Sequence, residues 1–155
     1  MVPPKPPKSA GVQIFRFRVH WHAELTHFPI SFFMAALIFQ ILHLFPHRLS
    51  GAFEVASNVM LIAGTISMIP TTWSGWVTWR RRYGGVSALI FRRKIITSFV
   101  MLFISIVLTI WRTVFLPAFE DVPYGPSHWV YLAGTVLLMI GAGIEGFYGA
   151  RLNHR

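Results

Sequence analysis

The chain has 155 residues, of which 54% are hydrophobic and only 12% are charged, and its mean hydropathy is +0.56. Soluble domains carry about 25% charged residues, so this composition excludes an ordinary soluble protein and predicts an integral membrane protein. The formal net charge is +9, but the basic residues flank apolar runs, so we expect no nucleic-acid partner. The chain has no cysteine, which excludes disulfides, iron–sulfur ligation and covalent haem attachment.

The N-terminal region precedes the first apolar run and divides into two parts. Residues 1–10 are basic and rich in proline, without the apolar stretch of a signal peptide, and they predict a disordered tail. Residues 11–27 mix large apolar and basic side chains, which is typical of an amphipathic segment lying in the membrane interface. Within it, Thr26 is a candidate N-cap and Pro29 a candidate first-turn residue of the helix that follows.

Four apolar runs follow, at residues 28–45, 53–76, 95–116 and 129–150. Each is 18 to 24 residues long, and about 20 helical residues cross the hydrocarbon layer of a bilayer. The runs predict an all-α fold, an integral membrane four-helix bundle over residues 28–150, with a short basic tail at 151–155. A soluble all-helical core is the disfavoured alternative. Pro70 is expected to kink the second helix.

The distribution of lysine and arginine predicts the orientation of the bundle. Twelve of the 14 basic residues fall on one side of a four-span topology: before the first run, between the second and third, and after the fourth. Only Arg48 and Arg112 lie near the other side. Because cytoplasmic loops are enriched in lysine and arginine, both termini are predicted to be cytoplasmic. The localisation predicted is the bacterial inner membrane, with multiple passes.

Polar side chains recur at helical spacing inside three of the runs, and we expect these stripes to face one another, because lipid cannot satisfy such groups. Of the charged members, Arg112 is expected to pair with Glu54. Glu145 is expected to pair with Lys94, Arg93 or His27, since an ionised carboxylate in mid-membrane costs roughly 2.5–3.5 kcal/mol. Packing alone, without a functional role, also explains these stripes: Glu54, Asn58, Thr65 and Thr72; Ser98, Ser105, Thr109 and Arg112; Gly141, Glu145 and Gly149.

The stretch from His22 to Pro29, "HAELTHFP", resembles the H-P-x-x-x-H-F-P opening of a family of bacterial membrane proteins known as domain of unknown function 2231. The resemblance covers about residues 20–150, and "TTWSGWVTW" stands where that family has a Gly and a Trp. Ala23 replaces the family's proline, and Lys94 replaces a histidine that opens the third helix in many members. The resemblance implies a small helical bundle with a role beside electron-transfer chains, because related domains occur fused to Rieske-type or cytochrome c modules.

The histidines are candidate ligands of a b-type haem, which needs one or two neutral imidazoles aimed into the bundle. His43 ends the first run and His128 opens the fourth, so both lie at similar depth, as a bis-imidazole haem requires. The plainer interpretation of His43 is a polar side chain at the membrane interface, and that of His128 is a residue at the start of a helix. His22 and His27 are about 140° apart around a helix, so they serve one site only if His22 precedes the helix. The candidate iron ligands are His27, His43 and His128.

Quinone binding is a related hypothesis, because quinone sites often combine a histidine or carboxylate with aromatic walls near a membrane surface. On the basic side, the candidate residues are His27, Trp73, Trp76, Lys94 and Glu145. The tryptophans are equally interpreted as anchors at the membrane surface.

Soluble-enzyme motifs such as a phosphate-binding loop, a nucleophile elbow or HExxH are absent, and no independent catalytic activity is expected. The preferred hypothesis is a membrane subunit of an electron-transfer assembly, acting as an anchor or as an element that interacts with haem b or a quinone. Its partners would be the lipid bilayer and other membrane or redox subunits. A non-catalytic scaffold or assembly protein is the alternative, followed by a pathway for small solutes or protons.

Overall fold

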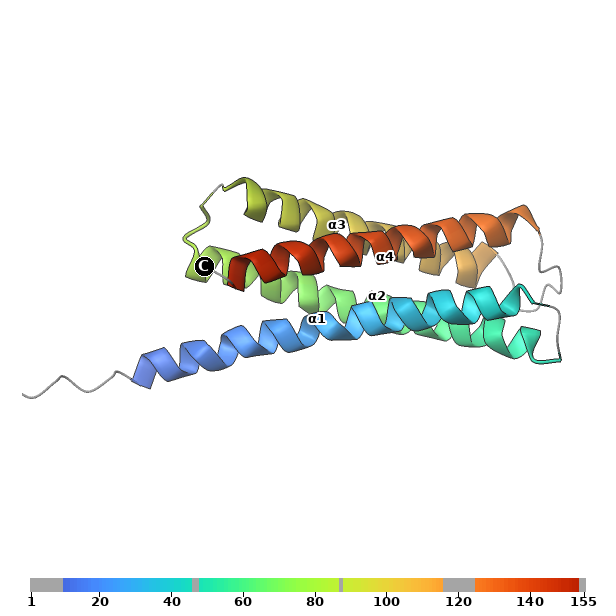
Figure 1. The fold of residues 1–155 in the computed structure, drawn as a ribbon, viewed down its shortest axis with the longest axis horizontal. Helices are drawn as coiled ribbons and strands as arrows, with labels where there is room; N and C mark the ends of the chain where they lie inside the picture. Colours follow the sequence, from blue (N-terminus) through green and yellow to red (C-terminus); the bar gives the residue numbers. More distant parts are fainter. Residues whose placement is uncertain (1–9, 46–47, 87, 116–124, 154–155) are drawn as a thin grey trace, which may run out of the picture.

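A computed structural model describes residues 10–45, 48–86, 88–115 and 125–153 of the chain. In these residues the chain is helical apart from short turns (Figure 1). The elements in chain order are α1 (Ala10–His43), α2 (Ser50–Arg82), α3 (Leu89–Ile110), a π-helical turn η1 (Trp111–Phe115) and α4 (Pro126–Asn153). The predicted all-α fold with four long helices is confirmed.

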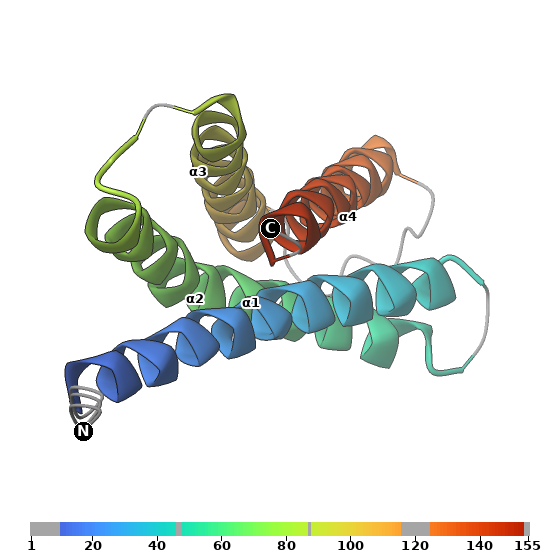
Figure 2. The same ribbon diagram turned by 60° about the vertical axis from the view of Figure 1, so that its left-hand side comes forward.

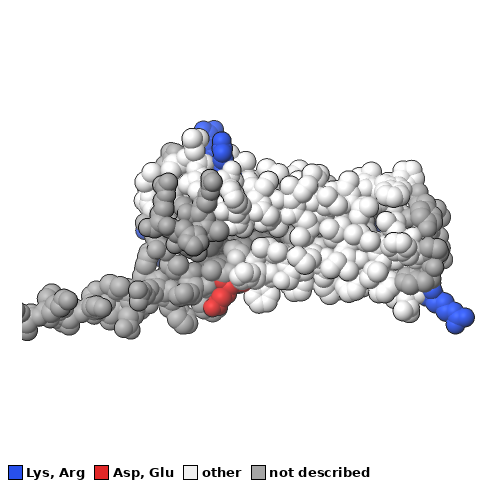
Figure 3. All heavy atoms as spheres, in the orientation of Figure 1, with Lys and Arg blue, Asp and Glu red and all other residues white. Residues whose placement is uncertain are grey.

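The four helices are long and apolar enough to cross a membrane, over Glu24–His43, Ser50–Arg81, Leu89–Val114 and Pro126–Tyr148. Large apolar side chains are exposed along all four of them, for example Ile38, Ile66 and Phe103, which is the surface that a lipid phase accepts. The space-filling view shows charged atoms toward the two ends and an uncharged middle (Figure 3). By the length and composition of its helices the protein is a multi-pass membrane protein, and its apolar faces are compatible with lipid contact.

Helix α1 begins well before the residue at which the sequence predicted it to start. It runs unbroken from Ala10, so Thr26 is not its N-cap and Pro29 lies inside it rather than in its first turn. Pro29 has no N–H to donate to the carbonyl of Leu25 four residues earlier. The Thr71 hydroxyl of α2 donates to that carbonyl at 3.1 Å, which is how proline is accommodated in spanning helices. Residues 11–27 belong to α1, and their placement in the membrane interface stays a prediction.

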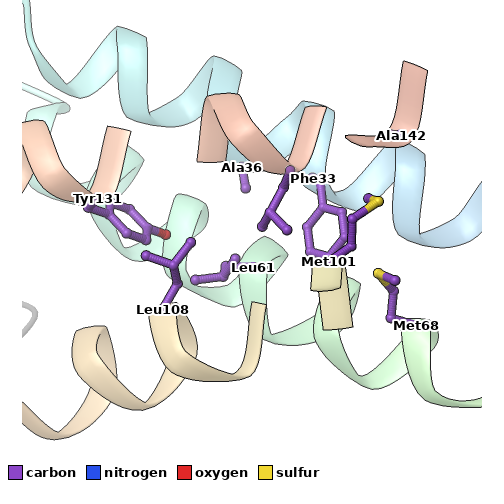
Figure 4. Close-up of a cluster of buried hydrophobic side chains, with 9 residues drawn as sticks. Phe33, Ala36, Leu61, Met68, Met101, Leu108, Tyr131 and Ala142 are labelled. Atoms are coloured by element: carbon purple, nitrogen blue, oxygen red, sulfur yellow. The ribbon is translucent and has the colours of Figure 1, made fainter. Parts of the chain in front are cut away.

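Consecutive helices pack against each other and α4 also packs against α1, which closes the bundle (Figure 2). A cluster of apolar side chains fills much of the bundle, with Phe33 and Leu61 fully buried in it (Figure 4). Leu138 of α4 is fully buried as well. Glycines allow neighbouring helices to pack closely: a Cβ on Gly64 of α2 would lie 2.5 Å from the Phe33 ring of α1. Gly141 packs in the same way against Met101, as its place in a small-residue stripe predicted.

The polar stripes of α2 and α3 face each other. The Thr65 hydroxyl lies 3.0 Å from that of Thr109 and 3.4 Å from the carbonyl oxygen of Ser105. Thr65 and Thr109 therefore satisfy each other across the two helices, as predicted, whereas Asn58 Oδ1 and Thr72 Oγ1 of the same α2 stripe are buried without a hydrogen-bond partner among the described residues. Pro70 also lies inside α2, and the expected kink stays a prediction.

Candidate functional site

Four ionisable side chains meet at the end of the bundle where α1 and α3 finish and α2 and α4 begin. We call them the histidine–carboxylate cluster: His43 from α1, Glu54 from α2, Arg112 from η1 and His128 from α4. Each is at most 6% exposed. Every helix of the bundle contributes one side chain, so the cluster exists only when all four are packed.

Glu54 is the centre of the cluster. Its carboxylate forms an ion pair with the guanidinium of Arg112, as the sequence predicted. The Nε2 atom of His128 lies 3.5 Å from Glu54 Oε1, and the Nε2 atom of His43 lies 3.9 Å from Glu54 Oε2. The two imidazole rings are stacked with centroids 5.3 Å apart. One carboxylate thus faces three nitrogen-bearing side chains in a dry interior, where each interaction is stronger than in water.

Hydrogen bonds from neighbouring helices hold the cluster in place. The Nδ1 atom of His43 lies 2.8 Å from the carbonyl oxygen of Ser50 at the start of α2. The Gln40 amide donates to the carbonyl of His128 at 3.4 Å and accepts from the Thr135 hydroxyl at 2.8 Å. The Arg112 guanidinium lies 5.6 Å from the ring centroid of Tyr131, within the range of a cation–π interaction.

Arg112 reaches the cluster from a π-helical turn. Helix α3 ends at Ile110, and Trp111–Phe115 continue it with a wider turn. Such turns are rare and occur frequently at functional sites. The wider turn changes the direction in which the following side chains leave the helix. The Arg112 side chain is 3% exposed. An unpaired arginine at this depth would be costly, and its pair with Glu54 removes that cost.

The arrangement of the histidines bears on the haem hypothesis. The structure brings His43 and His128 together, but their rings lie face to face at an interplanar angle of 23°. Two imidazoles bound to opposite faces of one haem iron point at each other end to end through the metal. The rings as they stand do not fit that arrangement, and a haem held by both would require them to separate.

A second polar site lies at the opposite end of the bundle, between the start of α3 and the end of α4. The ammonium of Lys94 lies 3.8 Å from Glu145 Oε2, and the Ser98 hydroxyl donates to Glu145 Oε1 at 2.9 Å. The predicted pairing of Lys94 with Glu145 is confirmed. Both side chains are partly exposed, 24% for Lys94 and 18% for Glu145. We call these three residues the basic-end site.

The remaining predicted residues do not join either site. His27 is exposed on α1, and among the described residues no hydrogen bond or ion pair joins it to Lys94 or Glu145. Trp73 is 64% exposed, and its ring is tilted by 39° against that of Trp76 with centroids 5.5 Å apart. The Arg80 guanidinium lies 4.4 Å from the centre of the Trp76 ring. These aromatic contacts favour the interpretation of the tryptophans as surface anchors. Helix α1 includes both His22 and His27, so the condition for a shared site is not met, and the side chain of His22 lies outside the described residues.

Sequence reasoning missed that Glu54 and Arg112 belong to the same site as the two histidines, and it missed the supporting residues. Gln40 and Tyr131 each lie three residues from a cluster histidine, on the same helix face as His43 and His128 respectively. That spacing is the signal that could have found them.

Comparisons with protein-family models, with curated proteins and with solved structures found no match for this chain. The likeness to domain of unknown function 2231 stays a prediction.

Proposed function

We propose that the protein is a membrane subunit of an electron-transfer assembly that presents a hydrogen-bonding site to a quinone at the basic-end site. The observation that carries this proposal is the ion pair of Lys94 and Glu145 inside two spanning helices, partly open to the surroundings. Ionisable residues within spanning segments are costly and mark functional pathways or ligand sites. This pair is accessible at its edge, where a ligand from the membrane can reach it.

The chemistry of the basic-end site suits a quinone head group. A quinone carbonyl accepts hydrogen bonds, and its reduction to a quinol takes up protons as well as electrons. Lys94 has three donor protons, while the single hydroxyl proton of Ser98 is donated to Glu145 and holds that carboxylate in place. The Glu145 carboxylate is able to accept or release a proton beside them. The head group would reach these residues from the lipid, where quinones dissolve.

The apolar centre of the bundle favours this function over a transmembrane pathway. Between the two polar sites, Phe33, Leu61 and Leu138 are fully buried and pack with Met68 and Met101. A route for solutes or protons through one copy of the chain would have to pass these packed side chains, and the Thr65 and Thr109 hydroxyls beside them are bonded to each other. The exposed apolar faces of all four helices also leave room for partner subunits in the membrane.

The test is to purify the tagged chain from its native membranes in mild detergent. We expect a co-purified subunit with a reducible cofactor, detected by the optical difference spectrum before and after dithionite, and quinone extractable at close to one per complex. Glu145→Gln should lower the quinone content at least several-fold. The matched control is Glu24→Gln, which removes an exposed carboxylate of α1 and should leave the quinone content unchanged. Purification without any redox subunit, or quinone no higher than in the surrounding lipid, would overturn the proposal.

A further inference from the structure

We infer that His43, Glu54 and His128 form a binding site for a divalent metal ion of the zinc type. One ligand atom from each residue, two imidazole nitrogens and a carboxylate oxygen, lies within 4.8 Å of the other two, and all three side chains are buried. The site is separate from the basic-end site and does not rest on the function proposed there, because it is built from different residues at the other end of the bundle.

The hydrogen bonds at Nδ1 of His43 are the observation that points to a cation. The Ser50 carbonyl oxygen can only accept, so the Nδ1 atom 2.8 Å away must carry the ring proton. The Ser50 hydroxyl donates its own proton to the His43 carbonyl at 2.9 Å. It therefore accepts from Nδ1 as well, at 3.0 Å. In the neutral ring, Nε2 then has a bare lone pair.

That lone pair has nothing to bind among the described residues. Nε2 of His43 is buried without a hydrogen-bond partner in the described part of the chain, and Glu54 Oε2 lies 3.9 Å from it. A nitrogen lone pair and a carboxylate oxygen facing each other in a dry interior repel, and burying both unsatisfied is costly. A cation between them removes the repulsion and satisfies both atoms.

The surroundings of these residues match those of metal ligands in proteins. Histidines that bind metals usually donate their other ring nitrogen to a carbonyl or carboxylate, which fixes the tautomer; His43 does this with Ser50. Glu54 can bind a metal through Oε2 while Oε1 keeps its contact with Arg112. Ligands about 2.0–2.1 Å from zinc are roughly 3.3 Å apart at a tetrahedral angle. The three atoms lie within 4.8 Å of one another, so each pair would have to close by at most about 1.5 Å to reach that spacing.

Two imidazoles and one carboxylate are a ligand set that zinc takes in proteins, with a fourth position left for water or a substrate. Arg112 limits the affinity, because its positive charge competes with the metal for the single carboxylate. Removing that charge should therefore tighten binding, an effect that a purely structural cluster would not produce.

The experiment loads the purified, chelator-treated protein in detergent with Zn²⁺ or Co²⁺. We expect one equivalent per chain, a rise in melting temperature, and the visible absorption of tetrahedral Co²⁺. His43→Gln and His128→Gln should each weaken the affinity by at least about 100-fold, because changing a residue that only hydrogen-bonds to a metal ligand already costs up to about 100-fold. Arg112→Met should strengthen it. The matched control is His27→Gln, the same change at an exposed position of α1, which should leave the affinity unchanged.

X-ray absorption of the Zn²⁺-loaded wild-type protein tests the site without any variant. Two imidazole nitrogens in the first shell would support it. A shell with fewer than two imidazoles, or an affinity unaltered when both histidines are changed, would overturn it and leave a proton as the only cation shared by His43 and Glu54. A chain that binds zinc but carries no quinone would keep this inference and lose the proposed function.

Discussion

At the scale of single residues, the balance of charge in the histidine–carboxylate cluster decides how much each side chain contributes. Glu54 and Arg112 are 5% and 3% exposed and neutralise each other. A buried pair of this kind adds little over an apolar pair of the same volume, because desolvation offsets the attraction. Removing one partner is different, since it leaves the other charge buried and unpaired.

Single changes in this pair are therefore expected to be costly and the double change mild. Glu54→Leu or Arg112→Leu should each lower the free energy of unfolding by about 3–5 kcal/mol, and the two together by clearly less than the sum. Unfolding in mixed micelles with a chelator present, followed by circular dichroism, measures this. The comparison variant is Lys94→Leu, which breaks a partly exposed pair and should cost less. Additive effects of the two cluster changes would contradict the ion pair.

At the scale of elements, a hydrogen bond joins α1 and α2 at a point where α1 lacks a backbone donor and a side chain of α2 supplies one. Pro29 leaves the carbonyl of Leu25 without its usual partner within the helix. The Thr71 hydroxyl donates to this carbonyl at 3.1 Å and also lies 2.8 Å from the carbonyl of Ser67 in its own helix. The contact shows how an unbroken α1 contains a proline.

Thr71→Val is expected to destabilise the bundle by about 1 kcal/mol, because the Leu25 carbonyl loses its donor. In the background of Pro29→Ala, which restores an N–H at that position, the same change should cost less. A double-mutant cycle by unfolding in mixed micelles measures the difference. Thr78→Val is the control, since the Thr78 hydroxyl bonds only within α2, to Ser74 at 2.7 Å. Equal costs of Thr71→Val in both backgrounds would show that the hydroxyl does not replace the missing donor.

At the scale of the whole molecule, the two polar sites lie at opposite ends of an apolar centre. The loop from α2 to α3 is flanked by arginines and a lysine, whereas the loop from α1 to α2 has Arg48 alone. This asymmetry predicts that the loop from α2 to α3 and both termini are cytoplasmic and that the histidine–carboxylate cluster lies toward the outside.

Because the natural chain has no cysteine, single introduced cysteines can test this orientation. Leu49→Cys and Val86→Cys change residues that are 59% and 60% exposed in the two loops. A membrane-impermeant maleimide should label the first in intact cells and the second only after lysis. The opposite pattern would invert the topology. Labelling of both cysteines from outside would contradict the single span, α2, between the two loops.

The sequence by itself determined that this is an all-helical membrane protein with four spans, because hydropathy and length are sums along the chain and need no knowledge of neighbours. It also predicted the pairing of Glu54 with Arg112 and limited the partners of Glu145 to Lys94, Arg93 or His27, since few charged residues share a depth in a four-span topology. The tertiary structure decided that His43 and His128 join Glu54 in one buried site while His27 stays exposed. Which side chains meet depends on the rotation of each helix about its axis, and close packing such as that of Gly64 on Phe33 sets this rotation.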